Sequence, residues 1–338
     1  MDMINIPIVH CFDNRYVIAA SVAFNSLLRS SCANYHYDLV VFHLDITEEN
    51  QKKLSKLVEN YPNATLEFIK LDTINNSMSL ILSELFMQIN NGYHFSKEMF
   101  VKLFLPELLL NYDYCIVSDV DVLYKNDVSK QFIRYIKNSQ SSYIAGISLF
   151  LARKMSSVRE WLNEVYKDFS LDEQKILHSG IGAGYMFFNL AKMRKDRVTD
   201  KLIQFAKENI SRLVLPEQDI INLCLYKHIQ KLPFSTMIIN ELYDSSEINK
   251  KTELLVINNP VQLHYSSWKK PWSVLNCAKR DLWYKELCQT DFYIDLVDSL
   301  IKNKEENNRI IKSSYHKKRC KFLNVFKWLF KKCVNGLK

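Results

Sequence analysis

The sequence predicts an α/β protein with a doubly wound, mostly parallel sheet and a helical, basic C-terminal extension. The first third of the chain alternates short β-rich runs with helical patterns, which is typical of βαβ units. The 338 residues, 48% of them hydrophobic, are enough for one large domain with a substantial core. Ten of the 45 basic residues and no acidic residue follow Glu306, so the rest of the chain holds 35 basic against 37 acidic residues. The net charge of +8 therefore belongs to the tail.

The predicted elements follow one another along the chain. A strand over Ile4 to Phe12 leads into an Ala- and Leu-rich helix over Val17 to Leu28. The same alternation gives elements over Tyr37 to Leu44, Glu48 to Asn60, Leu66 to Leu71, Lys97 to Leu110 and Tyr114 to Ser118. Further on we expect a strand over Tyr143 to Ser148, a helix over Val158 to Phe169, a strand after the glycines at 180–184, a helix from Pro216, a strand over Leu254 to Ile257 or Val261 to Leu263, and helix from about 280.

An Asp-x-Asp pair follows one of these strands directly. Asp119-Val120-Asp121 comes after the apolar run Tyr114 to Ser118, and because side chains alternate across a strand, both carboxylates would lie on one face. Two carboxylates favour a hard divalent ion, Mn²⁺ or Mg²⁺, which in turn favours phosphate oxygens. The alternative is that Asp121 caps a turn and Asp119 faces solvent.

A second polar cluster, Asp13-Asn14-Arg15-Tyr16, follows the first strand. In an open α/β sheet, ligands bind beyond the carboxyl ends of the strands, where the strand order reverses. Both clusters fall at such ends. We therefore expect them to face one crevice.

Three of the six glycines lie within five residues, at Gly180, Gly182 and Gly184. Glycine permits positive φ and lets a ligand approach the backbone closely, so the segment suits a sugar or phosphate lying against main-chain amides. A simple β-bulge or tight turn is the alternative.

Polar residues mark two more candidate positions near the end of the domain. The predicted helix at Pro216 opens with Glu217, Gln218 and Asp219, although acids at a helix start also suit the helix dipole. His264 ends a predicted strand, and Lys270 follows six residues later, before Pro271. His264 would suit a metal ligand and Lys270 a cation that binds a diphosphate. A lone polar residue with satisfied hydrogen bonds is the alternative for His264.

The tail places apolar residues 322, 326, 329 and 333 on one helical face with lysines around the rest. Such a cationic amphipathic helix binds anionic lipid at a membrane surface. The alternative is a helix that packs on its own domain. No nucleic-acid-binding module is evident. Because the eight cysteines lack a disulfide or zinc spacing, and no export signal or membrane span is evident, we expect a cytoplasmic protein attached peripherally to the inner face of the cytoplasmic membrane.

The spacing of these motifs resembles the family 8 retaining glycosyltransferases, especially bacterial enzymes that add glucose or galactose to lipopolysaccharide and related surface glycans. The resemblance runs from Ile6 to about Trp272, and it is most specific in the segments Phe100 to Leu109, Tyr114 to Tyr124 and Asn126 to Val128. It implies a nucleotide-sugar fold of GT-A type over residues 1–275, a helical region over 276–306 and a membrane-associating tail over 307–338. It also implies a UDP-glucose or UDP-galactose donor and a glycan or glycolipid acceptor.

The resemblance also implies roles for individual residues. The uracil and ribose pocket would be lined by Cys11, Asp13 and Arg15, with Tyr16 stacking on the base. Asp119, Asp121 and His264 would bind Mn²⁺ or Mg²⁺, while Lys102 and Lys270 would face the donor diphosphate. The remaining contacts to the donor would come from Val120, Gly182, Ala183, Glu217, Gln218 and Ser267.

For catalysis with retention of configuration, the resemblance places Gln218 nearest the anomeric carbon. Because an amide is a poor nucleophile, we favour attack by the acceptor on the face that the diphosphate leaves, with Asp219 hydrogen-bonding around the sugar and Asp121 holding the metal. Three positions differ from the family pattern: Lys102 replaces the usual arginine, Gly182 the usual asparagine and Glu217 the usual aspartate. The alternatives are a catalytically silent membrane scaffold and a metal-dependent phosphotransferase, which would also use an Asp-x-Asp pair but places Thr or Ser where this chain has Leu123.

Overall fold

The computed structural model describes residues 3–74, 76–89, 95–139, 141–148, 155–233, 235–243, 259–266, 269–274 and 276–302. The chain divides into two compact units, Met1–Thr290 and Asp291–Lys338. In the second unit, residues 292–302 are helical. The predicted tail helix, at 307–338, lies outside the described residues. Within the described part of the chain, no helix combines the length and apolar character needed to cross a bilayer.

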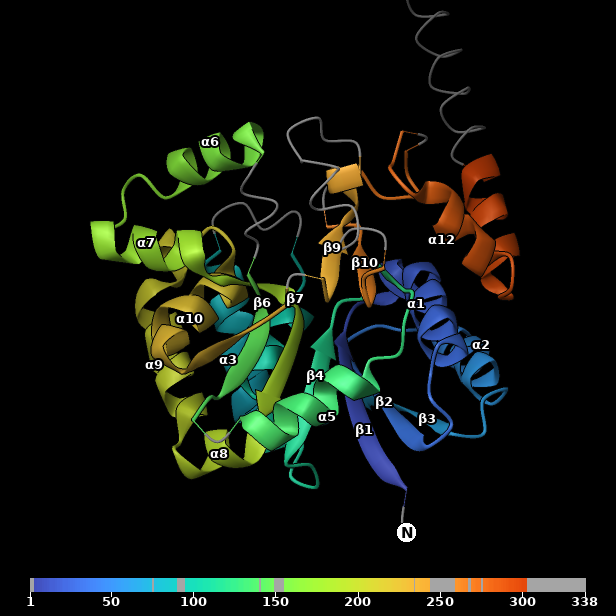
Figure 1. The fold of residues 1–338 in the computed structure, drawn as a ribbon, viewed down its shortest axis with the longest axis horizontal. Coiled ribbons are helices and arrows are strands. Elements are labelled where there is room, and N and C mark those ends of the chain that lie inside the picture. Colours follow the sequence, from blue (N-terminus) through green and yellow to red (C-terminus); the bar gives the residue numbers. More distant parts are fainter. Residues whose placement is uncertain are drawn as a thin grey trace, which may run out of the picture. The chain divides into compact units, whose positions relative to one another are not determined.

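The first unit is built on a seven-stranded sheet with the order β3-β2-β1-β4-β7-β6-β8 (Figure 1). Four of its strand pairs are parallel, and β7 runs antiparallel to both β4 and β6. The predicted doubly wound, mostly parallel sheet is therefore confirmed. Its strands are β1 Ile4–Cys11, β2 Tyr35–His43, β3 Ala64–Lys70, β4 Tyr114–Ser118, β6 Ile144–Ser148, β7 Ile181–Asn189 and β8 Ile229–Leu232.

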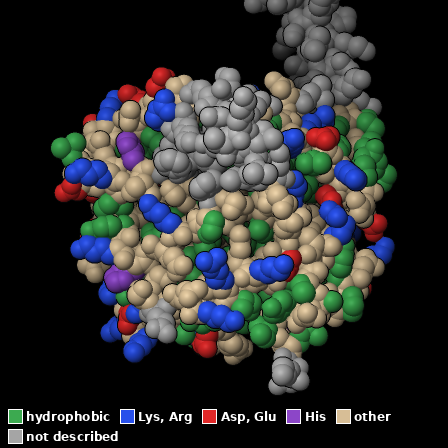
Figure 2. Space-filling model, viewed as in Figure 1, with side chains coloured by type: hydrophobic (Ala, Val, Ile, Leu, Met, Phe, Trp, Pro, Cys, Tyr) green, Lys and Arg blue, Asp and Glu red, His purple; other side chains and the backbone are tan. Residues whose placement is uncertain are grey.

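Helices flank this sheet on two sides. In Figure 1, α1, α2 and α12 lie together beside the half formed by β1 to β3, while α7 to α10 lie beside β6 and β7. The α-helices that the structure describes in the first unit are α1 Val17–Arg29, α2 Glu48–Val58, α3 Asn76–Met87, α4 Leu105–Leu108, α5 Ser129–Asn138, α6 Ser156–Val165, α7 Leu171–Ser179, α8 Leu190–Lys195, α9 Val198–Asn209, α10 Pro216–Leu225 and α12 Arg280–Leu287. On the face in Figure 2, Lys and Arg side chains are scattered singly, in keeping with the near-neutral composition of this part of the chain.

The strand order reverses between β1 and β4. These two strands are parallel neighbours, with Ile8 opposite Ile116 and Val9 opposite Val117. All four of these side chains are fully buried, so burial on both faces fixes the register. The loops that follow them, with Asp13 and Asp119, therefore emerge next to each other at the switch point.

A second, three-stranded sheet has the order β5-β10-β9 and was not predicted. Its strands are β5 Val122–Tyr124, β9 Met237–Ile239 and β10 Gln262–His264. His264 lies opposite Val122 in the antiparallel β5–β10 pair. This pairing brings a histidine from late in the chain beside the Asp-x-Asp segment.

Two predictions about local structure were wrong. The single helix predicted over Lys97 to Leu110 is a 3₁₀ helix, Lys97–Leu103, followed by the short helix α4. Pro106 lies in the first turn of α4 and has no backbone N–H, so it cannot continue an α-helical hydrogen-bond ladder from the preceding turn. The strand predicted after the glycines at 180–184 instead begins at Ile181, so that Gly182 and Gly184 lie inside β7. None of the described glycines has a positive φ.

Of the two alternatives for the late strand, the structure has the second, as β10 at Gln262–His264. The other, Leu254 to Ile257, lies outside the described residues.

Candidate functional site

The Asp-x-Asp segment lies in a bend between β4 and β5, not in a strand. Strand β4 ends at Ser118, so strand alternation is not what brings the two carboxylates together. Two backbone hydrogen bonds fix the bend instead. The Asp119 N–H donates to the Gly184 carbonyl at 3.0 Å, and the Asp121 carbonyl accepts from the Tyr265 N–H at 2.9 Å.

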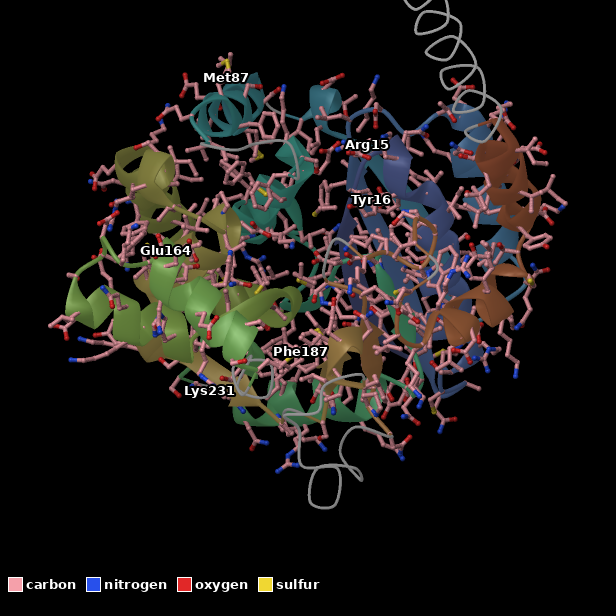
Figure 3. The ribbon with its side chains drawn as sticks, turned by 90° about the horizontal axis from the view of Figure 1, so that it is seen from above. Arg15, Tyr16, Met87, Glu164, Phe187 and Lys231 are labelled. Carbon is pink, nitrogen blue, oxygen red and sulfur yellow. The ribbon has the colours of Figure 1, made fainter. Side chains whose placement is uncertain are left out.

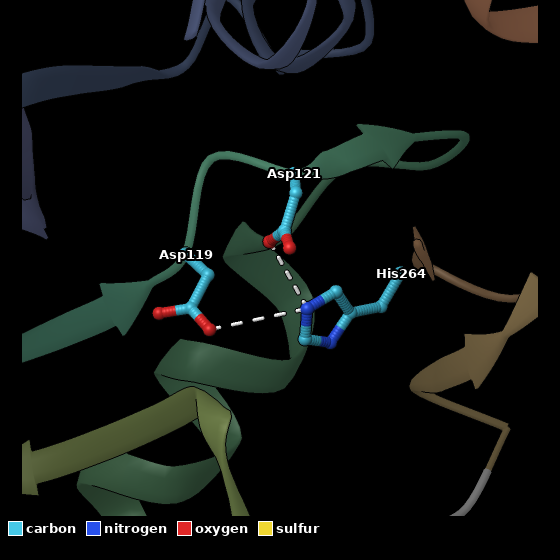
Figure 4. A group of neighbouring side chains, drawn as sticks. All are labelled: Asp119, Asp121 and His264. Atoms are coloured by element: carbon cyan, nitrogen blue, oxygen red, sulfur yellow. Dashed lines mark hydrogen bonds and ion pairs between the residues drawn. The ribbon is translucent and has the colours of Figure 1, made fainter. Parts of the chain in front are cut away.

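Asp119, Asp121 and His264 converge on one point (Figure 4). The imidazole Nε2 of His264 lies 3.1 Å from Asp121 Oδ1 and 3.9 Å from Asp119 Oδ2. One ligand atom from each residue lies within 4.8 Å of the others. Two carboxylates and one imidazole suit a divalent cation such as Mn²⁺ or Mg²⁺. The donor set and its spacing therefore fit a metal.

Two lysines flank this cluster, one beside each aspartate: Lys102 is buried and Lys270 is half-buried. Lys102 Nζ lies 2.9 Å from Asp119 Oδ1, and Lys270 Nζ lies 2.5 Å from Asp121 Oδ2. Burial alone would raise the pKa of Asp121, but the opposing effects of His264 and Lys270 hold that pKa well below its usual range. Asp121 is therefore a carboxylate, ready to accept a cation, at any pH that a cell experiences.

The loop after β1 supplies the second predicted cluster. Asp13 accepts hydrogen bonds from the backbone N–H and the guanidinium of Arg15, at 2.9 Å for both N–H and Nε. The Tyr16 ring packs edge-to-face on Trp272, with ring centroids 5.9 Å apart. Arg15 and Tyr16 lie side by side at the start of α1 (Figure 3). Tyr16 lies close enough to the metal cluster for Lys270 and Asp121 to affect its pKa, which burial raises.

Cys11 ends β1 beside this loop. Burial raises the pKa of its thiol to about 12, which favours the neutral thiol over the thiolate.

The N-terminal turn of α10 approaches strand β7 next to Lys102. Gln218 Oε1 accepts a hydrogen bond from the Ala183 N–H at 3.1 Å. Glu217 Oε1 lies 3.6 Å from Lys102 Nζ, which also donates to the Ala183 carbonyl at 3.2 Å. Burial raises the pKa of Glu217. Glu217, Gln218 and Ala183 are thus linked, through Lys102, to the Asp119 side of the cluster.

Asp219 is not part of this group, contrary to the prediction. Its side chain is fully buried. Oδ2 accepts the N–H groups of Val214 and Leu215 at 3.0 Å each, and Oδ1 accepts the Tyr166 hydroxyl at 2.7 Å. These three hydrogen bonds occupy both carboxylate oxygens and hold the entry to α10, which gives the side chain a structural role.

The remaining predicted site residues are Val120, Gly182 and Ser267. Val120 is buried, with a side chain in the core beneath the bend. Gly182 lies on β7 next to Ala183. Ser267 lies outside the described residues. Gly184, which contacts the metal cluster, was missed as a site residue, although its place among the three clustered glycines was a usable signal.

The fold and the cluster define an α/β protein with a candidate divalent-metal site at the switch point of its sheet. The chain belongs to glycosyl transferase family 8, whose family model matches residues 7–275. The resemblance noted from the motifs is therefore confirmed.

Relatives from several bacteria share this sequence pattern. The chain is 22% identical to the glycosyltransferase GlyF of Streptococcus pneumoniae, in an alignment over 82% of this chain and 60% of GlyF, so it spans less than two thirds of that relative. It is 24% identical to general stress protein A of Bacillus subtilis, over 79% of this chain and 87% of that protein. It is 23% identical to a lipopolysaccharide 1,2-glucosyltransferase of Escherichia coli, over 77% and 71%.

Solved structures show the same fold. The bifunctional glycosyltransferase WbbM superposes with a TM-score of 0.67 at 19% identity, covering 88% of this chain and 52% of that one. The galactosyltransferase LgtC, solved with donor and acceptor sugar analogues, superposes with a TM-score of 0.61 at 18% identity, covering 85% and 96%. The GT-A type fold predicted for this chain is thereby confirmed.

Proposed function

We propose that the protein is a metal-dependent retaining hexosyltransferase that moves glucose or galactose from a UDP-sugar to a bacterial surface glycan, such as lipopolysaccharide core or O-antigen. The observation that carries the proposal is the convergence of Asp119, Asp121 and His264 at the switch point of a family 8 sheet. The names of the E. coli glucosyltransferase and of LgtC support the two hexoses.

The three converging side chains would hold Mn²⁺ or Mg²⁺. A bound dication supplies Lewis-acid stabilisation of the negative charge that develops on a departing diphosphate. Lys270, next to Asp121, would bind the same diphosphate. Its ammonium is held by Asp121 Oδ2 and by the Tyr265 carbonyl at 2.6 Å, so it is oriented before any ligand arrives.

The nucleotide would lie over the loop after β1. Asp13 and Arg15 are already ordered by their mutual hydrogen bonds, and they would contact the uracil and ribose together with Cys11. Tyr16 would stack on the base from its place against Trp272. Because these groups are preorganised, little conformational entropy would be lost on binding.

The hexose would lie between the metal cluster and the first turn of α10. Lys102, Glu217 and Gln218 meet there with the backbone of Ala183, next to Gly182 in β7. The Asp219 carboxylate is engaged in hydrogen bonds within the fold. Of the described carboxylates in this turn, this leaves Glu217 to contact the sugar. This supports attack by the acceptor on the leaving-group face, with Gln218 positioning the donor.

We further propose that residues 1–275 form the catalytic domain, that 276–306 form a helical region, and that 307–338 attach the protein to anionic lipid on the inner face of the cytoplasmic membrane. The support is the basic and apolar pattern of the tail. This arrangement would place the site next to a glycolipid acceptor.

The test is hydrolysis of UDP-glucose and UDP-galactose by the purified full chain, with Mn²⁺, with Mg²⁺ and with a chelator. We expect release of UDP from at least one donor that depends on the metal. Binding of UDP without hydrolysis or transfer would favour the silent scaffold. Release of phosphate from a phosphorylated substrate, with no effect on UDP-sugars, would favour a phosphotransferase.

A further inference from the structure

Gly184 lies where the three segments that form the cluster meet. It is an interior residue of β7, and its neighbour Tyr185 pairs with Ser118, the last residue of β4. Its carbonyl accepts the Asp119 N–H at 3.0 Å, so the strand pairing continues one residue into the Asp-x-Asp bend. The backbone of Gly184 thus fixes the position of the first metal-binding aspartate.

The space beside Gly184 is filled by the imidazole of His264. A Cβ at residue 184 would lie 2.4 Å from His264 Cε1, 2.9 Å from His264 Nδ1 and 3.0 Å from Asp119 Oδ2. Atoms at these distances overlap, so a methyl group and the ring cannot both stay in place. Gly184 has no positive φ, which means that the position needs glycine for space and not for backbone conformation.

The backbone that carries the imidazole is held in place. His264 is held in β10 opposite Val122, and the Tyr265 N–H donates to the Asp121 carbonyl, so the backbone on either side of the ring is paired. A ring displaced by a methyl group would have to change rotamer. That change would move Nε2 away from Asp121 and Asp119.

We propose that Gly184 is a positioning residue of the metal site: the missing side chain lets the His264 ring lie against β7 with Nε2 near both carboxylates. The inference rests on the proposed metal site and deepens it. In this proposal Gly184 supports the metal site indirectly, by allowing the orientation in which His264 can bind the metal.

The experiment compares Mn²⁺ binding and thermal unfolding of the full chain for the wild type and for Gly184→Ala. We expect Gly184→Ala to bind Mn²⁺ about 10- to 100-fold more weakly, as is usual when a supporting group is altered. The matched control is Gly146→Ala in the neighbouring strand β6, where a Cβ would lie 2.3 Å from Ile181 Cδ1. This variant carries a similar steric clash in the core, and we expect its Mn²⁺ affinity to stay within twofold of the wild type.

A double-mutant cycle shows whether the effect passes through the imidazole. Removing the ring removes the clash, so Gly184→Ala should lower the melting temperature less in a His264→Ala background than in the wild type. An equal loss of stability in both backgrounds, or unchanged Mn²⁺ affinity in folded Gly184→Ala, would overturn the proposal. If the wild type binds no Mn²⁺, the proposed metal site fails, while the stability cycle still reports on the contact between residue 184 and the ring.

Discussion

Lys270 and Asp121 form a largely buried ion pair in which the lysine Nζ lies 2.5 Å from Asp121 Oδ2. The lysine also donates to the Tyr265 carbonyl at 2.6 Å. Asp121 lies between this ammonium group and the His264 ring. Its other oxygen, Oδ1, is 3.1 Å from His264 Nε2. One carboxylate therefore orients both a candidate metal ligand and a candidate phosphate-binding cation.

Removing the Lys270 charge should slow the chemical step. We expect Lys270→Met to lower kcat for hydrolysis or transfer from the UDP-sugar by about 10²- to 10³-fold. Removing a preorganised group that stabilises a developing negative charge usually lowers kcat by this factor. Steady-state kinetics with saturating Mn²⁺ would measure the effect. Lys269→Met, which removes the same charge from the adjacent position, is the control and should keep kcat within a few-fold of the wild type. Equal losses in the two variants would contradict a specific role for Lys270.

Asp121→Asn should remove metal binding with little change in fold. The amide keeps the size of the carboxylate but loses the charge that a hard divalent ion requires. We expect Mn²⁺-dependent release of UDP to fall below detection and the far-UV circular dichroism to match the wild type. The control is Asp113→Asn, just before the opposite end of β4, where the side chain is largely exposed. Full activity of Asp121→Asn in the presence of a chelator would rule out the metal scheme.

Truncation after Glu306 should separate membrane binding from catalysis. The deleted segment carries ten basic residues and no acid, and each basic residue near an anionic surface contributes about 1 kcal/mol to binding. We expect the truncated protein to hydrolyse the donor normally and to stay in the supernatant when anionic vesicles are pelleted, whereas the full chain sediments with them. Neutral vesicles serve as the control. If the truncated protein still pellets with anionic lipid, the role assigned to the tail is wrong.

The sequence was a good guide to the sheet and to the residues at its switch point. Val9 and Val117 belong to apolar runs whose ends carry Asp13 and Asp119, and the general rule for ligands in open α/β sheets places such ends together. The position of His264 beside the aspartates depends on pairing between two three-residue strands, β5 and β10. Strands that short carry too little alternation to be recognised from the chain alone.

Gln218 and Asp219 show a second limit of sequence reasoning. Both lie in the first turn of α10, and one helical residue corresponds to a rotation of about 100°. Gln218 therefore reaches β7, while Asp219 turns back to Val214 and Leu215. Which acid or amide faces the site depends on how α10 packs, and this packing is set by residues remote in sequence such as Tyr166.

The buried Asp219 gives a prediction for stability against pH. Burial raises its pKa from 3.8 to about 6 in the folded protein, despite its three hydrogen bonds. Because the folded pKa is the higher one, the folded state binds the proton more tightly than the unfolded state. The contribution of this group to stability is therefore fully present below pH 4 and is lost as the pH rises through 6. The shift corresponds to a change on the order of 3 kcal/mol in the free energy of unfolding.

Asp219→Asn should remove this dependence, because the amide does not titrate. We expect the free energy of unfolding of the variant, measured by urea denaturation, to increase relative to the wild type between pH 4 and pH 7. The hydrogen bonds from Val214 and Leu215 to the side-chain oxygen can persist in the amide, so the fold should be retained. Asp172→Asn, in the exposed first turn of α7, is the control and should follow the wild-type profile. If the difference in free energy of unfolding between Asp219→Asn and the wild type stays constant with pH, Asp219 has an ordinary pKa in the folded protein.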